Sequence, residues 1–86
     1  MIWKFKYRKQ AFSFLKEKEN DFVEIVRNKI ISFIRGEKVD IKKLKGKWEG
    51  FLRLRVGKIR VIFKLDVENK VIEIYKVGLR GKIYKK

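Results

Sequence analysis

Residues 51–65, FLRLRVGKIRVIFKL, constrain the fold more than any other part of the chain. Apolar and cationic side chains alternate along both halves of this stretch, and the halves meet at Gly57-Lys58, a pair that suits a tight turn. Because successive side chains of a strand point to opposite faces of a sheet, the alternation predicts a β-hairpin. One face of this hairpin is apolar, and the other carries Arg53, Arg55 and Arg60.

The three arginines of the hairpin are the first candidates for function. Directly opposite side chains of an antiparallel pair have Cβ atoms about 5 Å apart, so we expect the three guanidinium groups to lie close together. Like charges at this distance repel each other unless an anion accompanies them. We therefore expect an external anion, RNA phosphate in particular, to bind this face.

The overall charge of the chain favours the same interpretation. Its 86 residues include 25 Lys and Arg against 10 Asp and Glu, which gives a formal net charge of +15. A small domain with such a charge attracts polyanions at long range and binds them with an affinity that falls as salt rises. The alternative is the ion-pair-rich surface of a thermophilic protein, but such surfaces usually balance the two signs.

Residue types that are missing exclude several kinds of chemistry. The chain has neither cysteine nor histidine, which removes disulfides, thiolate catalysis, the commonest general acid–base and the commonest metal ligand. We therefore expect no metal and no cofactor. No apolar run approaches the roughly 18 residues of a membrane span, and the N-terminus lacks the apolar centre of a signal peptide. These observations predict a soluble, cytoplasmic protein without a membrane partner.

Helical spacing of apolar residues predicts two helices ahead of the hairpin. The first is short and covers residues 8–17, after a strand that alternation predicts over residues 2–7. The second, about 15 residues long, begins at Asn20 or Asp21, and Asp21 and Glu24 have the spacing of a capping box. Gly36 is expected to terminate this helix as the residue after its C-cap.

The order of these elements predicts the fold class. After the hairpin, residues 66–70 indicate a turn and residues 71–77 a further β-branched strand. The resulting order β-α-α-β-β-β predicts one α+β domain over residues 1–86, with an antiparallel-rich four-stranded sheet and two N-terminal helices packed on one face. The arginines then lie on the opposite face, which we expect to be open to water.

Residues 37–50 are rich in lysine and allow two interpretations. They form either a solvated connector or an additional rim that contacts phosphate, with Lys45 among its cations. We interpret Trp48 within this segment, and Trp3 near the N-terminus, as core residues rather than as platforms on which bases stack.

Together these residues resemble the RelE family of toxin–antitoxin endoribonucleases, within the RelE/ParE superfamily. The resemblance rests on Leu44-Lys45-Gly46, on the R-x-R-x-G-x-x-R pattern of the hairpin, and on residues 77–84, VGLRGKIY. With the upstream helices it covers nearly the whole chain. Near the C-terminus, an arginine followed four residues later by a tyrosine favours RelE over ParE.

The resemblance implies the toxin of a type II toxin–antitoxin system. Such toxins bind in the ribosomal A site and cut the mRNA there, which inhibits translation, and they use the RNA's own 2′-OH as nucleophile without a metal. The catalytic residues implied by position are Arg53, Arg55, Arg60, Arg80 and Tyr84. The RNA-binding candidates are Lys45, Lys58 and Lys82.

Attack by a 2′-OH builds negative charge on the phosphate oxygens, and guanidinium groups suit its stabilisation. We expect Arg60, with either Arg53 or Arg55, to hold the phosphate. Arg80 would stabilise charge on the leaving oxygen.

The general base stays open at this point. Arginine keeps its proton, and no histidine is present to replace the lysines that some family members carry in the hairpin. Tyr84 is the first candidate for the base, unless it stacks on a base of the RNA instead. Lys58 and Lys82 are the alternatives.

The resemblance also implies partners. Besides the ribosome and mRNA, we expect an acidic, partly disordered antitoxin that folds onto this basic surface. The toxin itself would be monomeric or part of a toxin–antitoxin hetero-oligomer. Two other functions stay open, namely a ParE-like inhibitor of DNA gyrase, which needs neither Arg80 nor Tyr84, and a non-catalytic basic RNA-binding domain.

Overall fold

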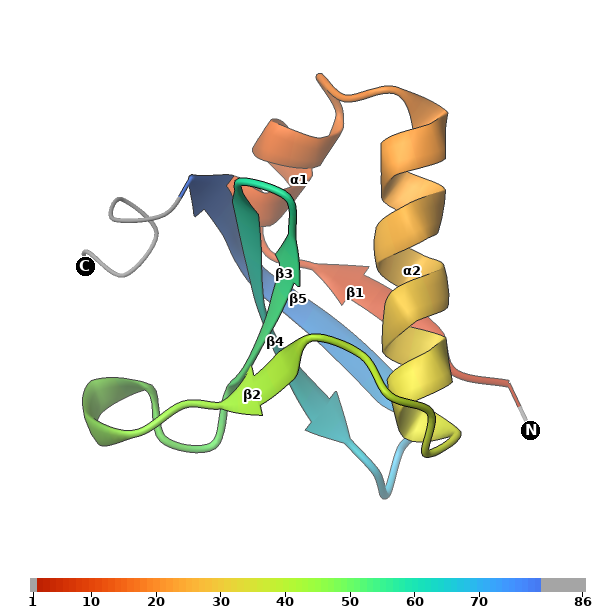
Figure 1. The fold of residues 1–86 in the computed structure, drawn as a ribbon, viewed down its shortest axis with the longest axis vertical. Helices are drawn as coiled ribbons and strands as arrows, with labels where there is room; N and C mark the ends of the chain where they lie inside the picture. Colours follow the sequence, from red (N-terminus) through yellow and green to blue (C-terminus); the bar gives the residue numbers. More distant parts are fainter. Residues whose placement is uncertain (1, 80–86) are drawn as a thin grey trace.

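The computed structural model describes residues 2–79, and its helices and strands form an α+β fold, as the sequence predicts (Figure 1). The strands are β1 (Lys4–Tyr7), β2 (Ile41–Lys43), β3 (Leu52–Val56), β4 (Ile59–Asp66) and β5 (Val71–Leu79). The helices are α1 (Lys9–Leu15), α2 (Asn20–Ile34) and a short 3-10 helix, η1 (Gly46–Trp48). Over residues 2–79 no helix is both long and apolar enough to cross a membrane.

The strands form one five-stranded sheet in the order β1-β5-β4-β3-β2. Strand β1 pairs in parallel with β5, and the other neighbours are antiparallel. The prediction of four strands was wrong by one, because β2 lies inside the lysine-rich segment that we interpreted as a connector or rim. This strand has only three residues, too few for alternation to be recognised in the sequence.

Both helices pack on one face of the sheet, on the right and at the top of Figure 1, and the chain after β2 extends away from them. The buried core lies between these layers. Its helical members are Ala11 and Leu15 from α1 and Val26 and Ile30 from α2. The sheet contributes Leu54, Val61, Phe63, Ile72, Ile74 and Val77. Within this core, Leu54 and Val61 are fully buried and directly opposite each other.

The ends of α2 show which local predictions hold. Gly36 follows its C-cap with φ of 90°, and its N–H donates to the Phe33 carbonyl at 3.0 Å, so this prediction is confirmed. The predicted capping box of Asp21 and Glu24 was wrong, because the residue at the N-cap is Glu19, which makes no side-chain capping bond. Asp21 lies within the first turn instead, where its charge interacts favourably with the helix dipole.

A β-bulge in the middle of β5 changes which of its side chains point to each face of the sheet. Ile62 of β4 pairs with Lys76, but the next residue, Phe63, pairs with Ile74, so Tyr75 is left without a direct partner. Ile74 and Val77 both belong to the core below the helices. Tyr75 and Lys76 therefore both lie on the face away from the helices, which strict alternation would not allow.

The start of α1 is attached to β5 by one side chain. Strand β1 covers the edge of β5 only as far as Ile74. Beyond it, the Gln10 amide donates to the Val77 carbonyl at 2.7 Å and accepts from the Val77 N–H at 2.9 Å. Gln10 thus replaces a neighbouring strand at this position and fixes α1 beside β5.

Candidate functional site

The three arginines of the hairpin lie on the sheet face opposite the helices, which we call the arginine face. Arg55 of β3 is directly across from Arg60 of β4, and Arg53 is directly across from Ile62. The turn between the strands is Gly57-Lys58, with φ of 60° at Gly57, as expected at the first position of a type II′ turn. The predicted placement of the arginines on one face is therefore confirmed.

A carboxylate from a neighbouring segment joins two of these arginines. Arg53 Nη2 donates to Asp40 Oδ1 at 2.8 Å, and Arg55 Nε donates to Asp40 Oδ2 at 2.6 Å. Asp40 immediately precedes β2, and its backbone carbonyl also accepts from the N–H of Arg55 at 3.1 Å. The expectation that only an external anion would offset the charges of the arginines was wrong, because the chain supplies Asp40.

The arginines determine the ionisation of Asp40. The hydrogen bond from Arg55 is the main reason that the pKa of Asp40 lies below its ordinary value of 3.8. The charges of Arg55, Arg53 and Lys42 lower this pKa further, and partial desolvation of the carboxyl opposes them. Asp40 is therefore ionised at neutral pH, and together with Arg53 and Arg55 it carries one net positive charge.

The arginines differ strongly in exposure, so the expectation of a face open to water was wrong in part. The Arg55 side chain is 51% exposed, the Arg53 side chain is 13% exposed, and Arg60 as a residue is 7% exposed. Arg53 Nε is buried and makes no hydrogen bond with the described residues. Arg60 Nη1 donates to the Gly57 carbonyl at 3.3 Å, and Gly78, directly across from Arg60 on β5, places no side chain beside it.

A hollow of about 400 Å³ opens at the end of the hairpin, and we call it the arginine hollow. It is lined by Arg55, Gly57, Lys58, Arg60 and Leu79, without an acidic side chain among them. Two guanidinium groups and one ammonium group in such a space suit a phosphate. Among residues 2–79 no acidic side chains gather in a group of three or more that could hold a metal ion.

The other predicted site residues divide into two groups. Lys45 is exposed just before η1, and it does not line the arginine hollow. Arg80, Lys82 and Tyr84 lie outside the described residues, which end at Leu79 beside the hollow. The roles predicted for these three residues stay predictions.

A second concavity, the aromatic groove, has a volume of about 510 Å³. It is lined by Arg8, Lys9, Gln10, Lys47, Trp48, Phe51, Tyr75 and Lys76. Trp48 meets Phe51 and Tyr75 edge to face, with ring centroids 5.4 Å and 5.7 Å apart, and Phe51 and Tyr75 are 5.0 Å apart. Trp3 packs against the core below the helices, but Trp48 does not, so the interpretation of Trp48 as a core residue was wrong.

Sequence reasoning missed Asp40 and most of the aromatic groove. Phe51 has the same alternation as Arg53, so the sequence places both on one face. Tyr75 could not be placed in this way, because the bulge moves it to this face. Asp40 could have been found only by predicting β2 and its register with β3.

Comparisons with known proteins show which solved structures are similar to this fold. Neither a family model nor a curated protein matches the sequence. Among solved structures, an archaeal RelE–RelB complex from Pyrococcus horikoshii is similar, with 30% identity, a TM-score of 0.68, and coverage of 95% of this chain and 99% of the other. A RelB–RelE complex from Methanococcus jannaschii has 23% identity, a TM-score of 0.63, and coverage of 87% and 89%. The YoeB–YefM complex from Staphylococcus aureus has 18% identity, a TM-score of 0.71, and coverage of 93% and 99%.

The last two similarities show a shared fold. The first is closer, since it joins 30% identity with alignment over nearly the full length of both chains. The five-stranded sheet and the two helices on one face agree with it. The chain therefore belongs to the RelE family of toxins, within the RelE/ParE superfamily.

Proposed function

We propose that this protein is a ribosome-dependent endoribonuclease of a type II toxin–antitoxin system. It acts in the cytoplasm, cuts mRNA in the ribosomal A site, and thereby inhibits translation. The observation that supports this most is the direct pairing of Arg55 with Arg60 beside a hollow that Lys58 also lines, with no acidic residue among the described residues that line it. These three cations, of which only Arg55 is paired with a carboxylate, that of Asp40, suit a phosphate that gains negative charge during its reaction.

In the proposed reaction the 2′-OH of a nucleotide attacks its own 3′-phosphate, and charge accumulates on the non-bridging oxygens. Arg55 and Arg60 stabilise this charge from two neighbouring strands. Arg60 is buried and bonded to the Gly57 carbonyl, so its guanidinium is oriented before RNA binds. A donor prepared in this way typically lowers the barrier by about 3 to 4 kcal/mol.

The two bonds of Asp40 suggest different roles for Arg53 and Arg55. The sequence left open which of the two holds the phosphate together with Arg60. Arg55 binds Asp40 through Nε, so its two terminal nitrogens are available to a phosphate. Arg53 binds Asp40 through a terminal nitrogen, is largely buried, and does not line the arginine hollow. We assign the phosphate to Arg55 and Arg60, and we assign to Arg53 the task of holding Asp40 in place.

Proton transfer is assigned to residues that follow β5. Because Gly78 is directly across from Arg60 and Leu79 lines the hollow, β5 leads the chain to this site just before Arg80. We propose Tyr84 as the general base, with Lys58 or Lys82 as the alternative. Arg80 stabilises charge on the leaving oxygen. The reaction as proposed uses no metal.

An antitoxin is the proposed protein partner. The similar RelE and YoeB chains were solved in complexes with RelB and YefM. A net charge of +15 favours an acidic partner, and we propose a partly disordered chain that folds on this toxin. The toxin alone is proposed to be a monomer that joins a hetero-oligomer with the antitoxin.

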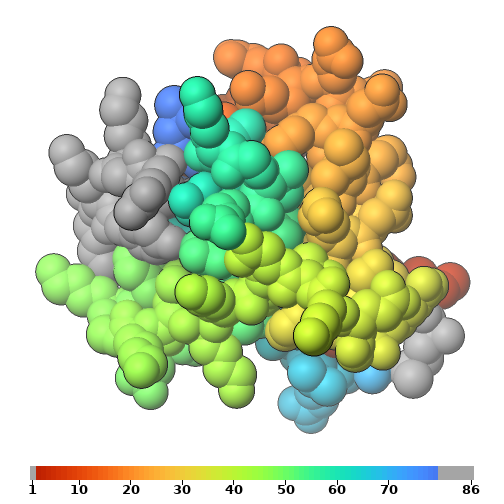
Figure 2. Space-filling model, viewed as in Figure 1, coloured from red at the N-terminus to blue at the C-terminus, as the bar shows by residue number. Residues whose placement is uncertain are grey.

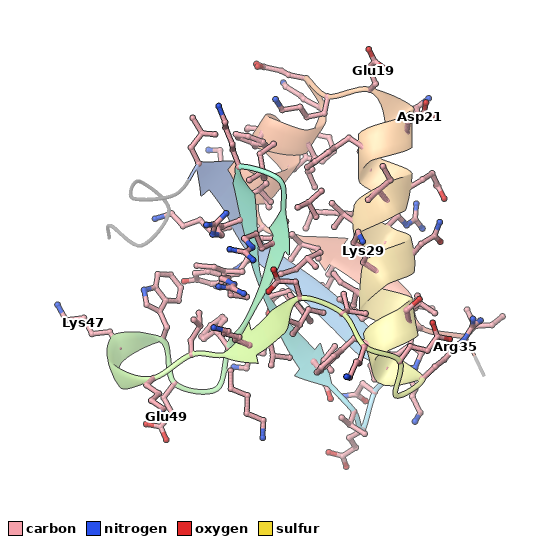
Figure 3. The ribbon with its side chains drawn as sticks, viewed as in Figure 1. Glu19, Asp21, Lys29, Arg35, Lys47 and Glu49 are labelled. Atoms are coloured by element: carbon pink, nitrogen blue, oxygen red, sulfur yellow. The ribbon has the colours of Figure 1, made fainter. Side chains whose placement is uncertain are left out.

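The experiment maps the ends of cleaved mRNA on programmed ribosomes and on naked mRNA. We expect the wild-type protein to cut the ribosome-bound mRNA only. Arg60→Met keeps the apolar stem but removes the charge, and we expect it to cut roughly 100 to 1,000 times more slowly. The control is Lys29→Met, which removes an exposed cation from α2, on the helix side of the sheet and away from the arginine face (Figure 3).

Equal cutting of naked and ribosome-bound mRNA would contradict ribosome dependence. Cutting by Arg60→Met at the rate of Lys29→Met would contradict the role of the arginine hollow. Growth arrest by a protein that cuts no mRNA in either setting would contradict the nuclease and favour a gyrase inhibitor of the ParE type.

A further inference from the structure

The aromatic groove has no part in the cleavage chemistry proposed above, although it lies on the same face of the sheet. We propose that it binds one unstacked nucleotide of single-stranded RNA, close to the bond that is cut. This inference rests on the proposed function, because it takes RNA as the substrate. Three features of the groove carry it: its rings, its charge, and its position beside the arginines.

The three rings form a cluster of their own. Trp48, Phe51 and Tyr75 are each partly exposed, contact one another at centroid distances of 5.0 to 5.7 Å, and stand apart from the helix-side core. Exposed aromatic residues that gather outside a core are typical of surfaces on which bases stack. Because every base has an aromatic face, such a cluster binds RNA with little sequence preference.

The charges of the groove match a phosphate chain. Its lining contains Arg8, Lys9, Lys47 and Lys76, and no acidic residue. Arg8 forms an ion pair with Glu73 at 3.3 Å, and its guanidinium lies over the Tyr75 ring at 4.9 Å from the centroid. We therefore assign to Arg8 the role of holding the Tyr75 ring in place, and not that of contacting a phosphate. Lys9 and Lys47 are exposed, and Lys47 extends from η1 on the side away from α2 (Figure 3). They are placed to contact phosphates on either side of a stacked base.

The groove lies on the arginine face, next to Arg53. On the same face, Phe51 precedes Arg53 by two residues, about 7 Å along an extended chain, and precedes Arg55, which lines the arginine hollow, by four residues, about 13 Å. Across the sheet, Lys76 is paired with Ile62, which is paired with Arg53. In the space-filling view, the segment around η1 lies beside the β3–β4 hairpin (Figure 2). An RNA strand held at the arginine hollow can therefore reach the groove with a nucleotide close to the bond that is cut.

An acidic peptide is the competing occupant of such a groove. It would satisfy the cations, but its side chains would leave three aromatic rings in water. A nucleotide of RNA would use both the rings, through its base, and the cations, through its phosphates. The structure therefore favours RNA.

The test uses the fluorescence of Trp48 in a Trp3→Phe background, where it is the only tryptophan. The probe is a 2′-O-methyl oligonucleotide of about eight nucleotides, a length within the usual site sizes, which cannot be cut by 2′-OH attack. We expect saturable quenching of Trp48. The affinity of Trp48→Leu, measured by the fluorescence anisotropy of the same oligonucleotide carrying a label, should fall roughly 5- to 150-fold, as is typical for one stacked base. Phe12→Leu, which removes an exposed ring of α1 outside the groove, is the matched control and should bind normally.

Two further probes of similar charge separate stacking from charge alone. An abasic oligonucleotide and a polyglutamate peptide should bind more weakly and leave Trp48 unquenched. Quenching by polyglutamate equal to that by RNA would overturn the proposal in favour of an acidic protein, and equal binding by the abasic chain would overturn the stacking.

The same variants separate this inference from the proposed function. If the wild-type protein cuts ribosome-bound mRNA and Trp48→Leu cuts it with unchanged rate and KM, the groove proposal is overturned and the nuclease stands. If RNA quenches Trp48 but no mRNA is cut, the groove proposal is supported and the nuclease fails.

Discussion

Replacing Asp40 with asparagine tests how far its carboxylate offsets the positive charge of the arginine face. In the structure this carboxylate occupies the space between Arg53 and Arg55, with one oxygen on each guanidinium. A phosphate that binds Arg55 must therefore share it with Asp40. Asparagine keeps the size of the side chain and removes its charge, so we expect Asp40→Asn to bind RNA more tightly at low salt.

The magnitude follows from the charges. Arg53, Arg55 and Asp40 carry one net positive charge, and the variant carries two. For single-stranded nucleic acid, each additional phosphate contact steepens the slope of log affinity against log salt by about 0.7. We expect this change in slope, which amounts to an additional loss of roughly 2.6-fold between about 50 and about 200 mM salt.

The assay is a fluorescence-anisotropy titration of a labelled 2′-O-methyl oligonucleotide at several salt concentrations. The control is Asp66→Asn, which changes the net charge equally but lies at the other end of β4, about 20 Å along the strand from Arg60. Asp66 is engaged with Asn69 rather than with an arginine. Equal changes of slope in both variants would refute the reasoning, because they would show that total charge, and not Asp40, sets the affinity.

Three further predictions concern stability. Leu54→Ala should lower the free energy of unfolding by about 2 to 5 kcal/mol in urea titrations, because it opens a cavity at a fully buried position. Gln10→Ala should lower it by about 1 to 3 kcal/mol, because the N–H and the carbonyl of Val77 both lose their partner, and hydrogen exchange at Val77 should accelerate. Since the folded protein holds the pKa of Asp40 below 3.8, the stability that Asp40 contributes is present above this value and is lost as the pH falls through the lowered pKa. The stability difference between wild type and Asp40→Asn should therefore be present at neutral pH and disappear in acid, whereas a difference that persists at the lowest pH would contradict the ion-pair explanation.

Local patterns were sufficient for the hairpin and its arginines. Alternation assigns every residue of a regular strand to a face, and a two-residue turn fixes which residues are opposite each other. The juxtaposition of Arg55 and Arg60 is therefore contained in residues 51–65 alone. The C-terminal end of α2 was predictable for a similar reason, because the position after its C-cap favours glycine and Gly36 occupies it.

Features that depend on distant pairing could not be read in this way. Asp40 reaches Arg53 and Arg55 only because β2 pairs with β3, and a strand of three residues leaves no recognisable pattern. Tyr75 reaches Phe51 and Trp48 only because of a bulge against β4, which interrupts the alternation of β5. In both cases the sequence shows the residue types, but the register between strands decides which of them meet.

The central claim is that guanidinium groups of the arginine face stabilise a phosphate under attack by the neighbouring 2′-OH. The most direct measurement is the cleavage of ribosome-bound mRNA that carries a single 2′-deoxynucleotide on the 5′ side of the bond that is cut. We predict that this bond stays intact, and that the all-ribose mRNA is cut to a product ending in a 2′,3′-cyclic phosphate. Cutting of both mRNAs at the same bond and the same rate would contradict the account.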